Sequence, residues 1–302
     1  MRFRHLGRRP VAVAGVATLV ATVVAGCGSS SSSSSAGGGG GATSNASIAA
    51  AVPQAIRSKG TLTVAADASY PPNEFLGTDN TTVQGMDADL AQALGQVMGL
   101  KVNVTNVTFD AILPGLASGK YDLGMSSFTD TKDREKTVDF VTYFSAGTSF
   151  YVKSSGGASI ASLDDLCGHK AAVEKGTTQA DDATAQDAKC KSANKGGVDV
   201  QVYTDQNGAN TAITSGRADV GMADSPVAAY VVKQANGAFK LSGQPYGTAP
   251  YGIAVPKGNG VAQPLLDALK VLMQNGTYKS ILAKYGIEAG AIDSPKINGA
   301  ES

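Results

Sequence analysis

Apolar positions recur at helical spacing in three parts of the chain. Residues 90–98 and 265–273 carry apolar side chains at i, i+4, i+7 and i+8, and residues 278–285 follow i, i+3, i+4 and i+7. Each stretch therefore predicts a helix with one face turned to a core. Short apolar or alternating runs predict strands at 63–67, 102–105, 170–174 and 198–202. Strands that alternate with helices indicate βαβ units and mostly parallel sheets.

A sequence pattern occurs twice and predicts two similar halves. Residues 118–125 and 215–222 both read S-G-[KR]-x-D-[LV]-G-M. Each copy follows an alternating strand and a helix-like stretch, and each is preceded by an earlier strand that ends in an acid, Asp67 or Glu174. The match lies in the same order of elements in both halves, so we expect two α/β lobes.

Four segments should meet in the cleft between these lobes. Ligands of open parallel sheets bind beyond the carboxyl ends of the strands. In this chain those ends deliver residues 67–70, 126–129, 174–179 and 223–225. These segments carry hydroxyls, carboxylates and an aromatic ring, so the predicted cleft is polar.

The side chains near these strand ends match the chemistry of an α-amino acid. Residues 176–179 open a predicted helix, whose free N–H groups bind anions. Arg134 can hold a carboxylate through two parallel hydrogen bonds. Asp224 can accept from an ammonium, and Tyr70 and Phe109 can flank a side chain. Together they predict a site for a zwitterion.

The first 26 residues have the character of an export signal. A basic segment, Arg2–Arg9, precedes an apolar stretch, Val11–Gly26, that is shorter than the ~20 residues of a membrane span. Val24–Cys27 resembles a bacterial lipobox, which implies cleavage before Cys27 and lipid attachment, with palmitate, at that residue. An ordinary signal peptide with a free cysteine is the alternative.

The next segment, 27–50, is expected to be a flexible tether. It contains an unbroken serine run, Ser29–Ser35, and an unbroken glycine run, Gly37–Gly41. Such a composition cannot bury enough apolar area to offset chain entropy. A lipid, a tether and a folded part would place the protein on the outer face of the cell membrane.

Charge and histidine content exclude several classes of function. The chain has 25 basic and 25 acidic residues, and removing four leader arginines leaves 25 − 4 = 21 against 25. No basic excess indicates nucleic-acid binding. His169 is the one histidine after the leader, which argues against a histidine-rich metal site or a Ser/His/Asp triad. We therefore expect no metal and no cofactor.

Cys167 and Cys190 are suited to a disulfide in an exported protein. Cys167 precedes a predicted strand, and Cys190 ends the helix, 178–189, that follows it. A strand and its returning helix bring those ends to the same edge of a layer, so a bridge is geometrically plausible. Two buried thiols are the alternative.

Three stretches resemble the extracytoplasmic polar-amino-acid-binding proteins of ABC importers, solute-binding protein family 3. Residues 85–91 are similar to the family signature G-[FIL]-D-x-D-L-A. Residues 109–116, continuing through Tyr121-Asp122 and 131–134 to 138–140, resemble the second stretch, and 276–278 the third. The resemblance covers about residues 52–287 and implies a two-lobed type II (Venus-flytrap) fold. The implied parts are lobe I (51–146 and 248–300), lobe II (147–247) and two crossing hinge strands near Gly147 and Tyr246.

By matching position, the resemblance implies roles for individual residues. Arg134 would bind the α-carboxylate with N–H groups at Thr129 and Thr178. Asp224 would bind the α-ammonium with Ser127 and Thr129. The other implied ligand contacts are the aromatic pair Tyr70 and Phe109, the specificity residues Asp67, Glu174 and Gln179, and their neighbour Ser126.

Each of these residues also has a plainer structural alternative. Arg134 could pair with Asp130 or Glu135 on the surface. Asp224 could cap the helix that begins at Ser225-Pro226. The remaining alternatives are core positions for Tyr70 and Phe109, a turn at Asp67 and a surface position for Glu174.

The resemblance implies a binding function without chemistry on the ligand. Asp67 and Glu174 favour a cationic or polar amino acid, with arginine or lysine ahead of glutamine, unless Lys175 points inward. The expected partners are a membrane permease and a separate ATPase chain, since no P-loop motif is present. The protein would act as a monomer with no nucleic acid. A sensor that docks to a receptor and a dehydratase-like enzyme are the alternatives.

Overall fold

The structure, a computed structural model, describes residues 43–301. The expected signal peptide, the lipid site at Cys27 and most of the expected tether lie outside these residues. Within the described part, no helix is both long and apolar enough to cross a membrane.

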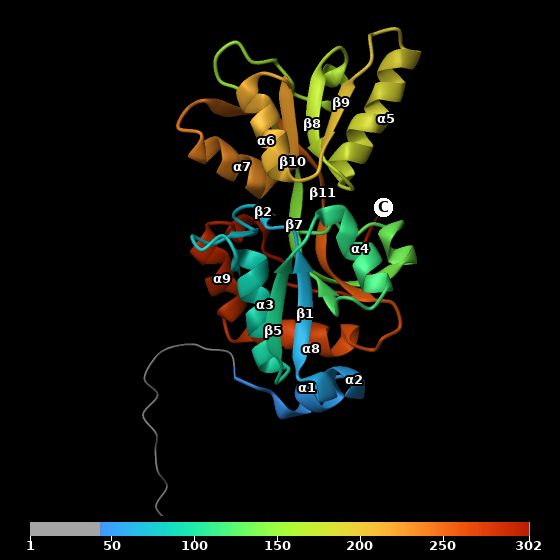
Figure 1. Ribbon diagram of the computed structural model, residues 1–302, viewed down its shortest axis with the longest axis vertical. Helices are drawn as coiled ribbons and strands as arrows, with labels where there is room; N and C mark the ends of the chain where they lie inside the picture. Colours follow the sequence, from blue (N-terminus) through green and yellow to red (C-terminus); the bar gives the residue numbers. More distant parts are fainter. Residues whose placement is uncertain (1–42, 302) are drawn as a thin grey trace, which may run out of the picture. The chain divides into compact units, whose positions relative to one another are not determined.

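The described chain alternates strands and helices in the order that the sequence predicts (Figure 1). The strands are β1 (Thr61–Ala66), β2 (Ser69–Tyr70), β3 (Glu74–Leu76), β4 (Val83–Gln84), β5 (Lys101–Asn106), β6 (Leu123–Gly124), β7 (Val138–Lys153), β8 (Lys170–Glu174), β9 (Asp199–Tyr203), β10 (Val220–Asp224) and β11 (Phe239–Pro256). The α-helices are α1 (Ala46–Ala51), α2 (Gln54–Lys59), α3 (Met86–Val97), α4 (Phe109–Ala117), α5 (Thr178–Ser192), α6 (Gln206–Ser215), α7 (Ser225–Gln234), α8 (Ala262–Gln274) and α9 (Thr277–Tyr285). Three short 3₁₀ helices are η1 (Arg134–Lys136), η2 (Leu163–Leu166) and η3 (Glu288–Gly290).

The main sheet repeats one arrangement in two lobes. Its strand order is β5-β1-β6-β11-β7-β10-β8-β9. β1 pairs in parallel with β5 and β6, and β8 pairs in parallel with β9 and β10. The first strand of each half therefore lies between the second and the third, which confirms the repeat. β7 and β11 run antiparallel to their neighbours and to each other, and they pass between the lobes (Figure 1).

The pairing of β7 with β11 is irregular where the chain passes from one lobe to the other. The register shifts between Ser242 and Tyr246 and again between Tyr246 and Ala249. Opposite this point, a Cβ on Gly147 would lie 2.6 Å from the carbonyl oxygen of Tyr246, so the close approach requires glycine. These irregularities lie where sequence reasoning expected the hinge.

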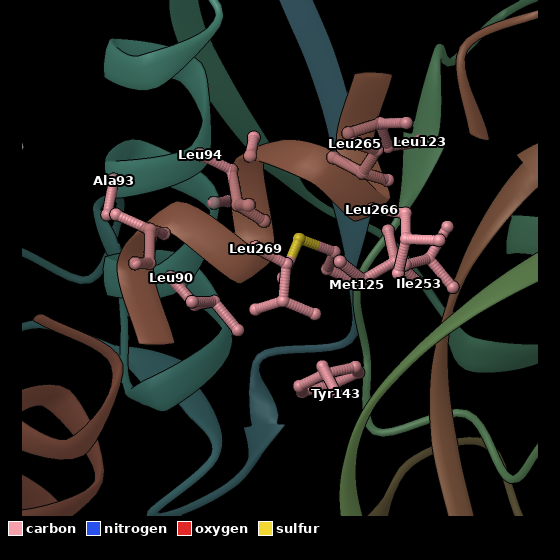
Figure 2. Packing of buried hydrophobic residues seen from close by; sticks show 14 of the residues in the cluster. Leu90, Ala93, Leu94, Leu123, Met125, Tyr143, Ile253, Leu265, Leu266 and Leu269 are labelled. Carbon is pink, nitrogen blue, oxygen red and sulfur yellow. The ribbon is translucent and has the colours of Figure 1, made fainter. Parts of the chain in front are cut away.

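Apolar helix faces cover both sides of the sheet in each lobe. In lobe I, the predicted stripes of α3 and α8 meet over β6 and β11, where Leu90, Leu94, Leu265 and Leu269 are fully buried (Figure 2). α4 covers the other face. In lobe II, α5 covers one face and α6 and α7 the other. The predicted amphipathic helices are therefore confirmed, with Met273, Ile281 and Tyr285 only half-buried.

The end of the expected tether is folded. Residues 46–50, assigned to the tether from composition, belong to α1, whose N-terminus is capped by the side chain of Asn45. Ile48 and Val52 are buried in the lobe I core. The serine and glycine bias stops before this point, and the alanine-rich turn has one apolar side chain to bury, so the assignment was wrong for these residues.

Cys167 and Cys190 form the predicted disulfide. Their Cα atoms are 5.5 Å apart, and the bridge joins the end of η2 to the last turns of α5. The helix continues past Cys190 to Ser192, slightly beyond its predicted end. The two cysteines are separated by 23 positions in the sequence, and the bridge between them closes a loop within lobe II.

Replacing both cysteines with alanine should lower the free energy of unfolding by about 3 kcal/mol, the chain-entropy contribution for a loop of this size. Urea denaturation followed by circular dichroism measures the change. A reducing agent should destabilise the parent protein and leave the double variant unaffected. Equal stability of the two proteins under oxidising conditions would contradict this expectation.

Candidate ligand-binding site

A cavity lies where the carboxyl ends of the strands of both lobes meet. All eleven residues that sequence reasoning assigned to the ligand line it, together with Glu74 and Thr177. The lining residues are Asp67, Tyr70, Glu74, Phe109, Ser126, Ser127, Thr129, Arg134, Glu174, Thr177, Thr178, Gln179 and Asp224. The structure therefore brings the predicted set together in one place.

Arg134 is held at the cavity by backbone carbonyls. Its Nη1 donates to the carbonyl of Thr129 at 2.8 Å, and its Nη2 donates across the cleft to the carbonyl of Gly176 at 3.0 Å. Its guanidinium lies 5.5 Å from the ring of Phe109 and 5.4 Å from that of Phe128, a cation–π arrangement. Burial lowers the pKa of Arg134, but a guanidinium keeps its charge.

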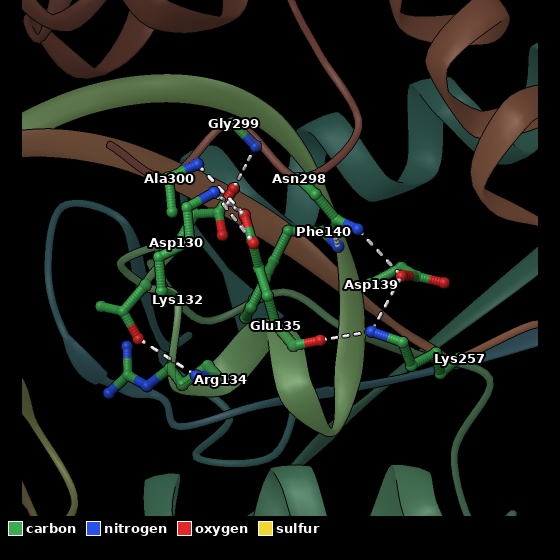
Figure 3. Close-up of polar contacts among 11 residues, drawn as sticks. Asp130, Lys132, Arg134, Glu135, Asp139, Phe140, Lys257, Asn298, Gly299 and Ala300 are labelled. Atoms are coloured by element: carbon green, nitrogen blue, oxygen red, sulfur yellow. Dashed lines mark hydrogen bonds and ion pairs between the residues drawn. The ribbon is translucent and has the colours of Figure 1, made fainter. Parts of the chain in front are cut away.

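The surface ion pairs that were the alternative for Arg134 do not form. Asp130 instead accepts from the backbone N–H of Gly299 at 2.8 Å, and Glu135 pairs with Lys132 at 3.1 Å (Figure 3). Within residues 43–301 no carboxylate lies within 4.0 Å of the Arg134 guanidinium in an ion pair. Its charge is therefore available to an anionic group in the cavity.

The start of α5 adds further donors beside Arg134. Thr177 caps the helix, and its side chain accepts from the backbone N–H of Ala180 at 3.2 Å. Thr178 is the first helical residue, and N–H groups of a first turn have no partner inside the helix. This end of the cavity combines a guanidinium with the positive end of a helix dipole.

Asp224 is buried and oriented by two donors. Gln179 Nε2 donates to its Oδ1 at 2.7 Å, and the hydroxyl of Tyr251 donates to its Oδ2 at 2.7 Å. Asp224 precedes α7, but its side chain makes no capping hydrogen bond, so the helix-cap alternative is wrong. Burial raises the pKa of Asp224 to about 6, which leaves the carboxylate mostly ionised at neutral pH.

Tyr70 and Phe109 line the cavity and also pack into the protein. The hydroxyl of Tyr70 accepts from the backbone N–H of Asp224 at 2.9 Å, and its ring joins a lobe II core cluster. Phe109 stacks on Phe128 with ring centroids 4.3 Å apart. Each ring therefore lines the cavity, as predicted, and also packs in the core, which was the alternative.

Asp67 and Glu174 bring two carboxyl groups to the cavity from opposite lobes. Asp67 accepts from the backbone N–H groups of Ser69 at 3.1 Å and Phe109 at 2.9 Å, so it also orders the turn after β1. Glu174 is 3% exposed, which excludes the surface alternative. Burial, followed by the charge of Asp67, raises the pKa of Glu174 to about 10.

Lys175 does not offset these acids. Its Nζ pairs with Asp110 of lobe I at 2.7 Å, and its side chain is 61% exposed. The ion pair runs along the outer rim of the cleft, so the expectation that Lys175 could point inward is not met.

Sequence reasoning missed Glu74, which lies on β3. Its carboxyl accepts from the hydroxyls of Ser126 at 3.0 Å and Ser127 at 3.2 Å. Behind it, Asp87 accepts from the backbone N–H of Ser127 at 2.8 Å and the hydroxyl of Tyr143 at 2.7 Å. Burial and the neighbouring Asp87 raise the pKa of Glu74 well above its ordinary value. The protonated form of Glu74 is therefore favoured.

These bonds fix a strained residue in the cavity wall. Ser127 has φ of +50°, a left-handed conformation that is uncommon for a residue other than glycine. The one sequence signal for this network was Asp87, an acid on the apolar face that also carries Leu90 and Leu94. Glu74 gave no such signal, and Thr177 lay inside a segment that was assigned to the cleft.

The two lobes are in contact around the cavity. In addition to the bonds of Arg134, Tyr70 and Lys175, the backbone N–H of Gln206 donates to the hydroxyl of Ser69 at 3.0 Å. The structure is therefore a closed form of the clamp.

Comparison with known proteins gives the class of this site. Residues 62–288 match the family of bacterial extracellular solute-binding proteins, family 3, and the chain belongs to that family. The arginine-binding protein ArgT of Corynebacterium glutamicum is 33% identical over 252 residues, which are 83% of this chain and 82% of that protein. Other curated relatives are named as amino-acid-binding proteins of ABC transporters. These relatives are binding proteins, which confirms the expectation of a binding protein over an enzyme.

Solved structures show the same fold. An ancestral arginine-binding protein bound to glutamine is 37% identical, with a TM-score of 0.70 over 76% of this chain and 99% of that one, and a second structure of such a protein contains arginine. An ancestral amino-acid-binding protein that is a precursor of cyclohexadienyl dehydratase is 34% identical, with a TM-score of 0.68 over 76% and 97%. The two-lobed fold is confirmed.

Replacing Asp87 with alanine should lower the free energy of unfolding by about 3 kcal/mol, because it leaves the N–H of Ser127 and the hydroxyl of Tyr143 buried without an acceptor. Urea denaturation at pH 7 measures the loss. Glu74→Gln is the matched control: it replaces a protonated carboxyl with a neutral amide and should cost less than about 1 kcal/mol. A larger loss for Glu74→Gln than for Asp87→Ala would show that the proton lies elsewhere.

Proposed function

We propose that this protein binds free arginine outside the cell membrane and delivers it to an ABC-type permease when its lobes close. The observation that carries the proposal is Glu174, a buried carboxyl with one oxygen that has no partner among the described residues and with Asp67 beside it. A cationic side chain could contact both acids and would offset one of their two charges.

The opposite end of the cavity suits the backbone of an amino acid. Arg134 and the first turn of α5 offer donors to an α-carboxylate. Asp224, held by Gln179 and Tyr251, offers an acceptor to an α-ammonium. Ser127 and Thr129 supply further oxygens at this end, while Tyr70 and Phe109 flank the path of the side chain.

The balance of charge favours a basic ligand. The described residues that line the cavity include four acids, Asp67, Glu74, Glu174 and Asp224, and one cation, Arg134. Glu74 is neutralised by its proton, and Asp224 is matched by the ammonium. Asp67 and Glu174 remain for the side chain. Arginine fits this pair because its planar guanidinium offers several donors to carboxylates, and lysine is the second choice.

Lobe closure links binding to delivery. Ligand groups that contact Arg134 and Asp67 of lobe I and Asp224 and Glu174 of lobe II are satisfied together only in the closed form, so the ligand shifts the population toward it. A permease would recognise that form. The ATPase would be a separate chain, the lipid at Cys27 would keep the protein at the membrane, and the protein would act as a monomer.

Isothermal titration calorimetry with each of the twenty amino acids tests the proposal. We expect arginine to bind most tightly, lysine next and neutral polar amino acids more weakly. Tight binding of glutamate without a response to arginine would contradict it.

Replacing Arg134 with alanine should weaken arginine binding by about 2–5 kcal/mol, because the carboxylate would lose a charge-assisted partner inside a closed cavity. Titration calorimetry measures the affinity. Lys132→Ala is the control, because Lys132 pairs with Glu135 outside the cavity. This variant should bind arginine with the affinity of the parent protein. Unchanged affinity in Arg134→Ala would remove this residue from the site.

A further inference from the structure

The charges that act most on Glu174 are acidic, and Tyr70 and Tyr151 are its other titratable neighbours. Besides Asp67, the charges that act on it are those of Asp205, which precedes α6, and Asp224, which ends β10. Lys175, next in sequence, is turned to Asp110 on the outer rim. Arg134 donates to backbone carbonyls at the other end. No ion pair reaches Glu174 from the part of the chain that the structure describes.

The two acids that face each other differ in how they are satisfied. Both oxygens of Asp67 accept backbone N–H groups, which favour its ionised form, whereas burial raises its pKa. Oε1 of Glu174 is buried without a partner. A buried oxygen without a partner costs about 1–3 kcal/mol, and more when it carries charge. The closed cavity therefore requires either a proton on Glu174 or a cation beside it.

We propose that Glu174 makes the choice of ligand depend on a proton: the lobes close over a cationic side chain with Glu174 ionised, and over an uncharged one only after Glu174 takes up a proton from solvent. This inference rests on the proposed function and adds a dependence on protonation to the specificity role of Glu174. In the second case the proton bonds to a carboxyl oxygen of Glu174, and no other bond changes.

The proposal predicts opposite pH behaviour for two ligands of nearly the same shape. In an open cleft Glu174 is solvated, so its pKa is close to the ordinary value for glutamate, about 4.3. When the lobes close over arginine, Glu174 stays ionised and neither takes up nor releases a proton. Closing over citrulline, its uncharged analogue, takes up one proton, so citrulline binding weakens as pH rises. The arginine-to-citrulline affinity ratio should increase about tenfold per pH unit above pH 5.

Using the ratio separates Glu174 from the titrating groups at the zwitterion end. Asp67 faces the same side chain as Glu174 and burial raises its pKa, so the Glu174→Gln variant below separates these two acids. Asp224 also titrates near this range, since burial raises its pKa to about 6. It faces the α-ammonium, which arginine and citrulline share. The Glu74 and Asp87 pair lies behind Ser126 and Ser127 and acts on both ligands alike. Changes at these groups cancel in the ratio.

The experiment is titration calorimetry of the parent protein with arginine, and displacement of arginine by citrulline, from pH 5.5 to 8.5. Buffers of different ionisation enthalpy give the number of protons exchanged. We expect uptake of about one more proton with citrulline than with arginine, and a ratio that rises about a thousandfold over the range. An arginine-to-citrulline affinity ratio that is constant with pH would overturn the proposal. It would also be overturned if millimolar citrulline failed to displace arginine at pH 5.5.

Two variants separate this role from a merely structural one. Glu174→Gln carries no titrating group and should make the ratio independent of pH, with weaker arginine binding and stronger citrulline binding at pH 8.5. Glu288→Gln, the same change at an exposed position, should retain the behaviour of the parent. A ratio that still rises with pH in Glu174→Gln would overturn the assignment to this residue. If arginine fails to bind the parent at any pH, the proposed function fails instead.

Discussion

The antiparallel pairing of β7 with β11 is the constraint on which the site depends. Each strand belongs to both lobes, so the two halves of the sheet share their central members. The same strands orient two residues of the cavity wall: Thr148 on β7 accepts from Gln179 Nε2 at 2.8 Å, and Tyr251 on β11 donates to Asp224. A change in the angle between the lobes is therefore felt by the side chains that orient the ligand acceptor.

Burial sets the chemistry of the cavity. Four acids in a small closed space would repel each other in water, and here desolvation acts against them as well. Different hydrogen-bond donors satisfy three of them: Asp67 accepts from backbone N–H groups, Asp224 accepts from Gln179 and Tyr251, and Glu74 accepts from the hydroxyls of Ser126 and Ser127. Glu174 is the acid for which the described residues supply no such donor to Oε1, and this difference distinguishes the side-chain end of the site from its zwitterion end.

Much of the fold and the site could be predicted because both follow from periodicity. The repeated S-G-[KR]-x-D-[LV]-G-M pattern fixed equivalent strands, and the ends of parallel strands must meet at one edge. That argument needs no side-chain directions, and it reached residues as far apart as Asp67 and Asp224. It failed where a side chain's direction decides the outcome. Lys175 follows Glu174 directly and points to the opposite side, and Glu74 reaches the cavity through packing of a short hairpin that has no counterpart in the second half. The fold of residues 46–50 depends on one buried side chain, Ile48, which composition cannot reveal.

Both ends of the described chain belong to lobe I. Asn45 bonds through its backbone N–H to the carbonyl of Val97, and at the other end Asn298 and Gly299 bond to Phe140 and Asp130 (Figure 3). Lobe II is therefore an insertion that leaves and re-enters through β7 and β11. A pull on either end of this folded part acts directly on lobe I. When the contacts around the cavity open, lobe II can swing about β7 and β11 without moving the point of attachment.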